Sequence, residues 1–295
     1  MTPSASILAP AKINLYLKVL GRRAGGFHDI ETLFQSVDWG DTVKVALTGH
    51  AVTLSVSGPY LGPMTENLAY RAAVMYREAA GVQCGIHVSL LKRIPAGAGL
   101  GGGSSDAAAV LTLLQHLCSG ALSASSLQLL AAELGSDVPF FLCGSTLAAA
   151  SGRGEVLVPL DSFAAARVYV VTPPVHVATS AAYGALAKGS IESDAGPTSW
   201  TPPRVDHWAD VIAIAMNDFE ATVSALHGEV GVALHALQAV GYPLVMLSGS
   251  GGACFALDPD DSIGPPSQSG RLSELGWPIV TTHTLTIPPS VSISC

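Results

Sequence analysis

The chain has 295 residues, of which 49% are hydrophobic and only 12% are charged, and its formal net charge is −8. This length and apolar content suffice for one large domain or two ordinary domains with buried cores. Only 14 residues are Lys or Arg, which argues against a nucleic acid as partner, because binding a strand of phosphates requires clustered cations.

Membrane insertion and metal binding by cysteines are also not expected. No apolar run approaches the roughly 20 residues that a membrane span needs, and no signal peptide is visible near the start. The five cysteines are odd in number, scattered and free of metal-ligand spacing: Cys84, Cys118, Cys143, Cys254 and Cys295. We therefore expect a cytoplasmic protein with no membrane partner and with thiols kept in a reducing compartment. The sequence leaves the oligomeric state open.

The first ninety residues favour β-strands. Segment 11–20, AKINLYLKVL, alternates in polarity and predicts a strand with one polar and one apolar face. The polar face carries Lys12, Asn14, Tyr16 and Lys18, and the apolar face carries Ile13, Leu15, Leu17 and Val19. Further strands are expected over 30–37, 51–58 and 85–95, with a turn at Gly40 and Asp41 and a helix over 66–81.

Helical patterns follow from residue 104 onward. Segment 104–117 is rich in Ala and Leu and predicts a helix, and a second helix is expected over 125–134. A third, short helix is expected near 136–142, because Asp137 precedes Pro139 as at many helix starts.

The composition changes past residue 155. Strands are expected over 167–174, 251–257 and 277–287, separated by polar, Pro-rich loops over 188–208 and 258–271. No internal repeat is visible. We therefore predict an α+β fold of two domains, 1–155 and 156–295.

The stretch PAGAGLGGGSSDAAA, residues 95–109, contains five glycines in seven positions. Gly97, Gly99 and Gly102 formally match the dinucleotide fingerprint GxGxxG. That fingerprint also needs an acidic residue about twenty positions later to bind the ribose, and the segment CSGALSASSLQ offers none. A Walker phosphate loop is excluded as well, because Ser104 follows Gly103 with no lysine between them.

A bare loop that leads into a helix predicts an anion site. Each glycine destabilises regular structure by roughly 0.5 to 1 kcal/mol relative to alanine, so five of them suggest that a ligand approaches the backbone closely. The first helical turn carries Ser104, Ser105 and Asp106, and its N–H groups point outward and favour negative charge. We therefore expect triphosphate binding, although the two hydroxyls could instead cap the helix.

The same stretch resembles the phosphate-binding motif of the GHMP kinases, the family of galactose, homoserine, mevalonate and phosphomevalonate kinases. Two further segments, PAKINLYLKV and LSGSGGACFAL, agree with the family's order of motifs. PAKINLYLKVLGRRAGGFHDIETLFQSVDWGD, ENLAYRAA and LGSDVPFFLCG are similar to the members whose substrate carries cytidine diphosphate. The resemblance covers most of residues 7–257. It implies an N-terminal domain like the second domain of ribosomal protein S5 and a ferredoxin-like C-terminal domain, with the active site in the cleft between them.

The resemblance implies a catalytic pair formed by Lys12 of PAK and Asp137 of GSDVP. Such an aspartate accepts the proton of an attacking hydroxyl while the ammonium favours the alkoxide, and a base of this kind contributes roughly 10²- to 10⁴-fold. Without the resemblance, Asp137 would be interpreted as a helix cap ahead of Pro139, and Lys12 as a solvated lysine on an edge strand.

The resemblance also implies which residues bind the two ligands. The ATP site would comprise Asn67, Pro95, Ala96, Gly97, Ala98, Gly99, Leu100, Gly101, Gly102, Gly103, Ser104 and Ser105. The substrate site would comprise Asn14, Phe27, His28, Thr179, Tyr183, Gly249, Ser250 and Gly251. Phe27 stands where many relatives carry tyrosine, which keeps an aromatic face but removes a hydroxyl. Alternatives stay open for Asn67 as a cap, for His28 as an exposed loop residue, for Tyr183 as a core residue and for 249–251 as a tight turn.

The implied activity is transfer of the γ-phosphoryl group of ATP to a hydroxyl of a small molecule that carries cytidine diphosphate. Mg²⁺ is expected from the presence of the nucleotide rather than from protein ligands. Two alternatives remain open: a GHMP kinase for a different alcohol, and a non-catalytic nucleotide-binding member of the family.

Overall fold

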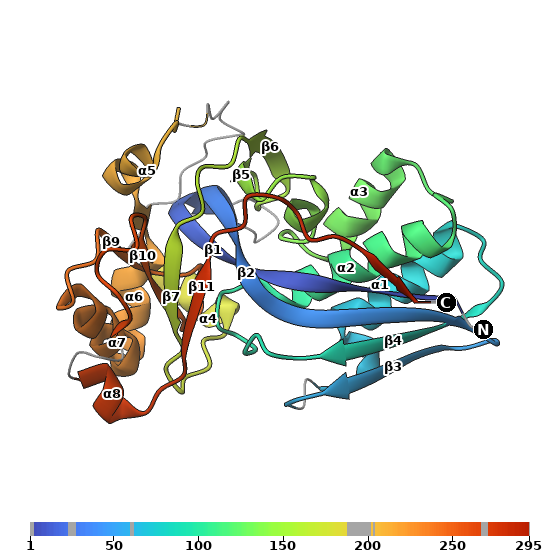
Figure 1. Cartoon of the computed structure of the whole chain (residues 1–295), viewed down its shortest axis with the longest axis horizontal. Coiled ribbons are helices and arrows are strands. Elements are labelled where there is room, and N and C mark those ends of the chain that lie inside the picture. The colour runs from blue at the N-terminus through green and yellow to red at the C-terminus, as the bar shows by residue number, and fades with distance from the viewer. Residues whose placement is uncertain are drawn as a thin grey trace.

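Two β-sheets organise the chain, and helices pack against both of them (Figure 1). The computed structural model describes residues 3–22, 28–59, 62–187, 202, 204–266 and 271–294. The first sheet has the order β12-β1-β2-β4-β3, with β5 paired to β2, β6 to β5 and β8 to β1. The second sheet has the order β11-β7-β10-β9.

The strands and helices have the following bounds. The first sheet comprises β1 (Ser4–Arg22), β2 (His28–Thr48), β3 (Val52–Ser57), β4 (Gly85–Leu91), β5 (Leu147–Ser151), β6 (Val156–Leu160), β8 (Met216–Asn217) and β12 (Ser292–Ser294). The second comprises β7 (Arg167–Val171), β9 (Leu244–Leu247), β10 (Cys254–Asp258) and β11 (Ile279–His283). The helices are α1 (Leu68–Ala79), α2 (Gly102–Leu117), α3 (Ala124–Leu134), α4 (Thr179–Ala187), α5 (Trp208–Ile214), α6 (Phe219–Leu226), α7 (Gly228–Gln238) and α8 (Arg271–Leu275), with 3₁₀ turns η1 (Met64–Glu66) and η2 (Pro139–Leu142).

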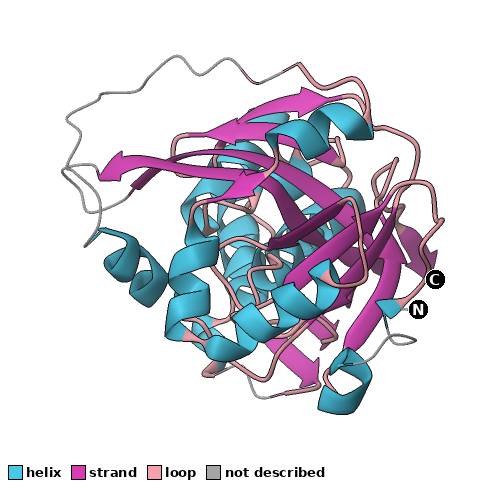
Figure 2. Ribbon diagram, turned by 90° about the vertical axis from the view of Figure 1, so that its left-hand side faces the viewer, coloured by secondary structure: helices cyan, strands magenta, loops and turns pink. Residues whose placement is uncertain are grey.

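Separate apolar clusters hold the layers together. One cluster joins β2 and β4 to α1 and α2, and it includes Val45, Ile86, Val110 and Leu114. Another joins β1 to the second sheet, so that the interior is continuous between the two sheets. Figure 2 shows the helices covering the strands in a view turned from that of Figure 1. Burial of these side chains is the main force that fixes the two sheets relative to each other.

The later half of the chain returns twice to the first sheet. β8 pairs with β1 in parallel at Tyr16 and Met216, and β12 pairs with β1 in antiparallel fashion at Ala5 and Ile293. The division into domains at residue 155 stays a prediction. β8 and β12 both follow residue 155 in the chain, yet both pair with β1 of the first sheet. In Figure 1 the two ends of the chain accordingly lie close together.

The predicted turn at Gly40 and Asp41 is wrong, because β2 continues through this position. Pro10 pairs with Gly40 and Ala11 pairs with Val37, so two extra residues bulge from β2 without ending it. A Cβ on Gly40 would lie 2.0 Å from the carbonyl oxygen of Ala9, which explains the glycine at this bulge. Helices α4 to α8 were not predicted from the sequence either.

Neither a disulfide nor a membrane helix is found in the described residues. Cys84, Cys118, Cys143 and Cys254 carry free thiols, and Cys295 lies outside the described part of the chain. Of the described helices, none has both the length and the apolar content that crossing a bilayer requires.

A buried ionic cluster fastens α2 to the first sheet. The Lys92 ammonium lies between the carboxylates of Asp41 and Asp106, with 2.6 Å from Nζ to Asp106 Oδ2. Asp41 Oδ1 also accepts hydrogen bonds from the backbone N–H groups of Arg93 at 2.5 Å and Ile94 at 2.9 Å. The chain entering the glycine loop is thereby fixed before the loop begins.

This cluster predicts a pH dependence of stability. Burial raises the pKa of Asp106 from 3.8 to about 7, and the Lys92 ammonium only partly opposes that shift. The folded protein therefore holds a proton that the unfolded chain releases, so the free energy of unfolding falls as pH rises from about 4 through about 7. Asp106→Asn should flatten this slope in urea unfolding curves recorded across that range. The exposed Asp260→Asn is the control, and an equal slope in Asp106→Asn and wild type would contradict the assignment.

Candidate active site

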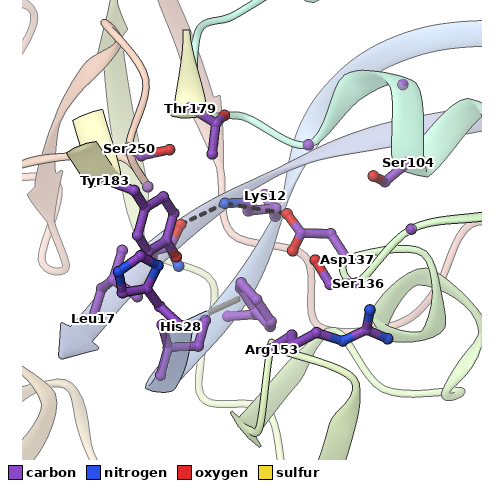
Figure 3. A pocket seen from close by; sticks show the side chains of 18 of the residues that line it. Lys12, Leu17, His28, Ser104, Ser136, Asp137, Arg153, Thr179, Tyr183 and Ser250 are labelled. Carbon is purple, nitrogen blue, oxygen red and sulfur yellow. Dashed lines mark hydrogen bonds and ion pairs between the residues drawn. The ribbon is translucent and has the colours of Figure 1, made fainter. Parts of the chain in front are cut away.

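A cavity of about 1050 Å³ lies between the two sheets and collects most of the residues that the sequence singled out (Figure 3). It is lined by the predicted residues Lys12, Asn14, His28, Gly97, Gly99, Gly101, Gly102, Gly103, Ser104, Asp137, Thr179, Tyr183, Gly249 and Ser250. These come from β1, β2, the glycine loop, α2, the segment before η2, α4 and the loop after β9. Segments far apart in sequence therefore meet in one place.

A smaller cavity of about 290 Å³ adjoins the same glycine loop. Asn67, Pro95, Ala96, Ala98 and Leu100 line it, as do Lys92 and Asp106 of the ionic cluster. Asn67 also caps α1, since its Oδ1 accepts from the N–H of Ala69 at 2.9 Å. The capping alternative for Asn67 is thus compatible with a position beside the loop.

Two predicted site residues, Ser105 and Gly251, line neither of these cavities. Phe27 falls outside the described residues. Ser105 is 1% exposed, and its hydroxyl lines neither cavity at the glycine loop and has no hydrogen-bond partner among the described residues. Gly251 is buried where its loop packs against the glycine loop. Only the first hydroxyl of the SS pair, that of Ser104, faces the main cavity.

Lys12 is the buried cation of the site. Its side chain is 5% exposed, and its Nζ donates to Asn14 Oδ1 at 2.5 Å and lies 3.8 Å from Asp137 Oδ2. The ammonium also lies 5.3 Å from the centre of the Phe34 ring. Burial lowers the pKa of Lys12, and the Asp137 carboxylate acts in the opposite direction. A buried, desolvated ammonium beside a carboxylate is typical of a catalytic group.

A β-bulge in β1 changes which residues face this cavity. The register shifts between Asn14 and Tyr16, so Leu15 is the extra residue on β1. Leu17 consequently lines the cavity together with Lys12 and Asn14. The prediction that Leu17 shares a face with Ile13 was wrong, because a strict two-residue alternation cannot cross a bulge.

Thr32 fixes the orientation of Asn14 and was missed by sequence reasoning. Its hydroxyl donates to the carbonyl oxygen of Tyr16 at 2.6 Å and accepts from Asn14 Nδ2 at 2.8 Å. With its Nδ2 engaged in this way, Asn14 presents Oδ1 to the Lys12 ammonium. Thr32 is fully buried on the neighbouring strand β2, and its place in the sequence, within IETLFQ, gives no sign of this contact.

Two glycine-rich loops contact each other through their backbones. A Cβ on Gly99 would lie 2.0 Å from the carbonyl oxygen of Ser248, and one on Gly251 would lie 2.0 Å from the N atom of Gly99. Gly99 also has φ +80°, which favours glycine. A Cβ on Gly103 would meet only a Leu68 methyl at 3.7 Å. Gly99 and Gly251 are therefore needed for the packing of the two loops. From the sequence we had expected the glycines of the first loop to serve a ligand alone.

The start of α2 offers backbone donors to the main cavity. The helix begins at Gly102, and Gly101 stands at its cap without a side-chain hydrogen bond. The N–H groups of the first turn therefore face a cavity that also contains the Lys12 ammonium. This combination favours an anionic ligand.

Aromatic rings mark the other end of the cavity. The rings of His28 and Tyr183 stack with centroids 4.6 Å apart, and Tyr183 meets Phe219 edge-on at 4.7 Å. Burial raises the pKa of Tyr183 to about 12, so its hydroxyl remains protonated. Both the core alternative and the ligand-facing prediction for Tyr183 are compatible with this position.

Asn217 holds the loop after β9 close to Lys12, and no pattern in the sequence indicated this residue. Its Nδ2 donates to the carbonyl oxygens of Leu247 at 2.8 Å and Gly249 at 2.9 Å. Its Oδ1 accepts from the N–H of Phe219 at 3.0 Å. The amide thus links α6 to the loop that closes over Lys12 and Asn14.

Comparison with known proteins places this geometry in a family. Residues 67–145 match the family model "GHMP kinases N terminal domain". The 4-diphosphocytidyl-2-C-methyl-D-erythritol kinase of Solibacter usitatus is 40% identical over 260 residues, covering 87% of this chain and 82% of that protein. The enzyme of the same name from Geobacter metallireducens is 35% identical and covers 96% of this chain and 99% of its own length.

Solved structures agree with the sequence relatives. A crystal structure of 4-(cytidine 5'-diphospho)-2C-methyl-D-erythritol kinase superimposes with a TM-score of 0.75 at 35% identity, covering 95% of this chain and 98% of that one. A homoserine kinase from Cytophaga hutchinsonii has a TM-score of 0.71 at 18% identity and covers 99% and 97% of the two chains. The second match shows a shared fold alone.

The hydroxyl of Thr32 provides the first test of the site. Thr32→Val keeps the shape but removes the acceptor for Asn14, so the amide can turn away from Lys12. We expect turnover to fall roughly five- to tenfold with little change in the KM for ATP, whereas Thr32→Ser should retain turnover. Steady-state kinetics on both variants, with melting temperatures as a folding check, measures this. Full activity in a folded Thr32→Val protein would remove Thr32 from any positioning role.

The two loops provide a second test, which separates packing from ligand binding. Gly251→Ala should destabilise the protein by about 1–3 kcal/mol, because its methyl group meets backbone. Gly103→Ala should leave stability unchanged or raise it by up to about 1 kcal/mol, while weakening ATP binding. Urea unfolding and calorimetric titration with a non-hydrolysable ATP analogue give the two readouts. Equal loss of stability in both variants would contradict the assignment.

Proposed function

Because this chain belongs to the 4-diphosphocytidyl-2-C-methyl-D-erythritol kinases of the GHMP kinase family, we propose that it uses ATP to phosphorylate the 2-hydroxyl of 4-diphosphocytidyl-2-C-methyl-D-erythritol. The products are the 2-phosphate and ADP, and the reaction belongs to the non-mevalonate route to isoprenoid precursors. The observation that carries the proposal is the buried Lys12 ammonium beside Asp137, in one cavity with the start of α2. A cytoplasmic location remains a prediction.

The positions of Lys12 and Asp137 support the following reaction. Asp137 accepts the proton of the substrate's 2-hydroxyl while the oxygen of that hydroxyl forms a bond to the γ-phosphorus of ATP. The bond between that phosphorus and the β,γ-bridging oxygen breaks, and ADP leaves with the electron pair. The Lys12 ammonium favours the alkoxide as negative charge develops, and Asn14 holds the ammonium in place.

The nucleotide phosphates would lie against the loop and the first turn of α2. Ser104 and Glu133 both line this cavity and carry side-chain oxygens, which are the kind of ligand that Mg²⁺ prefers. These two residues would hold the ion together with the phosphates, and the ion would neutralise phosphate charge when bound. In the described part of the chain no three His, Cys, Asp or Glu residues gather, so most ligands would be phosphate and water oxygens.

The substrate's cytosine would bind at the His28 and Tyr183 end of the cavity. An imidazole offers the donor and acceptor that the edge of a cytosine needs, and Tyr183 and Phe219 provide an apolar aromatic wall. Thr179, Gly249 and Ser250 would line the path between the base and the reacting hydroxyl.

A panel assay tests the substrate. ATP turnover is measured with the cytidyl substrate, mevalonate and homoserine, and turnover with the first alone is expected. Activity on mevalonate or homoserine but not on the cytidyl substrate would indicate a GHMP kinase for another alcohol. ATP binding without turnover on any of the three would indicate a non-catalytic member.

The base role of Asp137 has its own test. Asp137→Asn should keep the affinity for ATP, while turnover falls at least about a hundredfold because the hydroxyl proton has no acceptor. The exposed Asp161→Asn is the matched control. Nucleotide titration and single-turnover kinetics measure the two effects, and near-normal turnover would remove Asp137 from the base role.

A further inference from the structure

A tight turn between β5 and β6 brings a second cation to the cavity. Arg153 lines it together with Lys12 and Asp137, although no motif in the sequence singled it out (Figure 3). Gly152 and Gly154 flank Arg153 and have φ of +72° and +113°, so the turn relies on glycine at both positions. The N–H of Ile30 donates to the carbonyl oxygen of Gly152 at 2.7 Å, which fixes the turn to β2.

The turn passes directly beside the proposed base. A Cβ on Gly154 would lie 3.6 Å from Asp137 Oδ1, within ordinary van der Waals distance. The turn that carries Arg153 is therefore held next to Asp137, the proposed acceptor of the proton of the substrate's hydroxyl. The aromatic pair of His28 and Tyr183 lies at the other end of the cavity in Figure 3. The substrate hydroxyl must come within hydrogen-bond reach of Asp137, and the γ-phosphoryl group must lie next to that hydroxyl, because its phosphorus bonds to the same oxygen.

Glu155 orients the Arg153 side chain. Its carboxylate accepts from the Arg153 N–H at 2.6 Å through Oε2 and from Arg153 Nε at 3.3 Å through Oε1. The Arg153 side chain is 34% exposed, so the guanidinium is neither buried in the core nor fully in solvent. A guanidinium held along its Nε edge keeps the fork geometry that suits phosphate oxygens.

The charges around the cavity favour an additional cation. Among the described lining residues, Lys12 and Arg153 are the Lys or Arg side chains, while Glu133 and Asp137 are acidic. Lys12 is engaged with Asn14 and Asp137, and Arg153 is paired with Glu155, which does not line the cavity. A nucleotide triphosphate and a diphosphate substrate bring several negative charges into this space. The positive charge of the Arg153 guanidinium would balance part of that negative charge.

We propose that Arg153 is a catalytic residue that donates hydrogen bonds to the γ-phosphoryl oxygens of ATP during transfer. This inference rests on the proposed kinase function. While the phosphorus bonds to the substrate oxygen and separates from the β,γ-bridging oxygen, charge spreads over its peripheral oxygens, and the guanidinium stabilises it there.

The test compares Arg153→Met with Arg153→Lys, and with Arg167→Met as the matched control. Arg167 pairs with Asp261 at the start of β7 and does not line the cavity. Arg153→Met should weaken a non-hydrolysable ATP analogue roughly tenfold or more while ADP affinity changes less than about twofold, because only the analogue carries the γ group. Turnover should fall by a similar factor with the KM for the cytidyl substrate unchanged. Arg153→Lys should be intermediate, and Arg167→Met should match wild type.

The outcomes separate this inference from the proposed function. Equal weakening of the analogue and ADP, or a raised KM for the cytidyl substrate at unchanged turnover, would overturn the γ-phosphoryl contact. The binding comparison needs no turnover, so it stands apart from the question of which alcohol is phosphorylated. If Arg153→Met does not fold, Glu155→Gln replaces it, and the same pattern with a smaller effect is expected because the guanidinium loses its orienting carboxylate.

Discussion

The burial of one ammonium group is the constraint on which the site depends. Removing the Lys12 cation from water is unfavourable unless nearby oxygens replace the lost solvent. Asn14 and Asp137 supply those oxygens, and each is placed by a different part of the chain. Asn14 is oriented through Thr32 on β2, whereas Asp137 lies on the segment that leads into η2. The bulge at Leu15, the Thr32 hydroxyl and the segment before η2 therefore all contribute to the surroundings of the Lys12 ammonium.

Contact between two loops connects the surroundings of the Lys12 ammonium to the second half of the chain. The glycine loop and the loop after β9 meet through backbone atoms, with Ala253 N donating to the carbonyl oxygen of Ala98 at 3.0 Å. Asn217 holds the second loop by donating to the carbonyl oxygen of Gly249, and β8, which contains Asn217, pairs with β1. Residues from both halves of the chain consequently line the cavity.

The sequence predicts the elements that carry strong local signals. The strand around Lys12 follows from alternation, and the helix after the glycine loop follows from composition. The pairing of PAK with GSDVP follows only from the resemblance to the GHMP kinases. The bulge at Leu15 does not, because a single extra residue is set by pairing with β2 and leaves no local mark. Thr32 and Asn217 make contacts with distant segments, and Arg153 lines a cavity that distant segments form, so their neighbours in sequence do not indicate these positions. Helices α6 and α7 follow each other closely without a strong boundary signal.

The ionisation of Lys12 tests the account most directly. An NMR titration of the ¹⁵N-labelled Lys12 side chain, in wild type and in Asp137→Asn, measures its pKa in both environments. Burial should lower that pKa below its ordinary value of 10.5 in wild type, and loss of the Asp137 carboxylate should lower it further. A pKa at or above 10.5 in wild type, or no difference between the two proteins, would contradict a buried lysine sustained by Asp137.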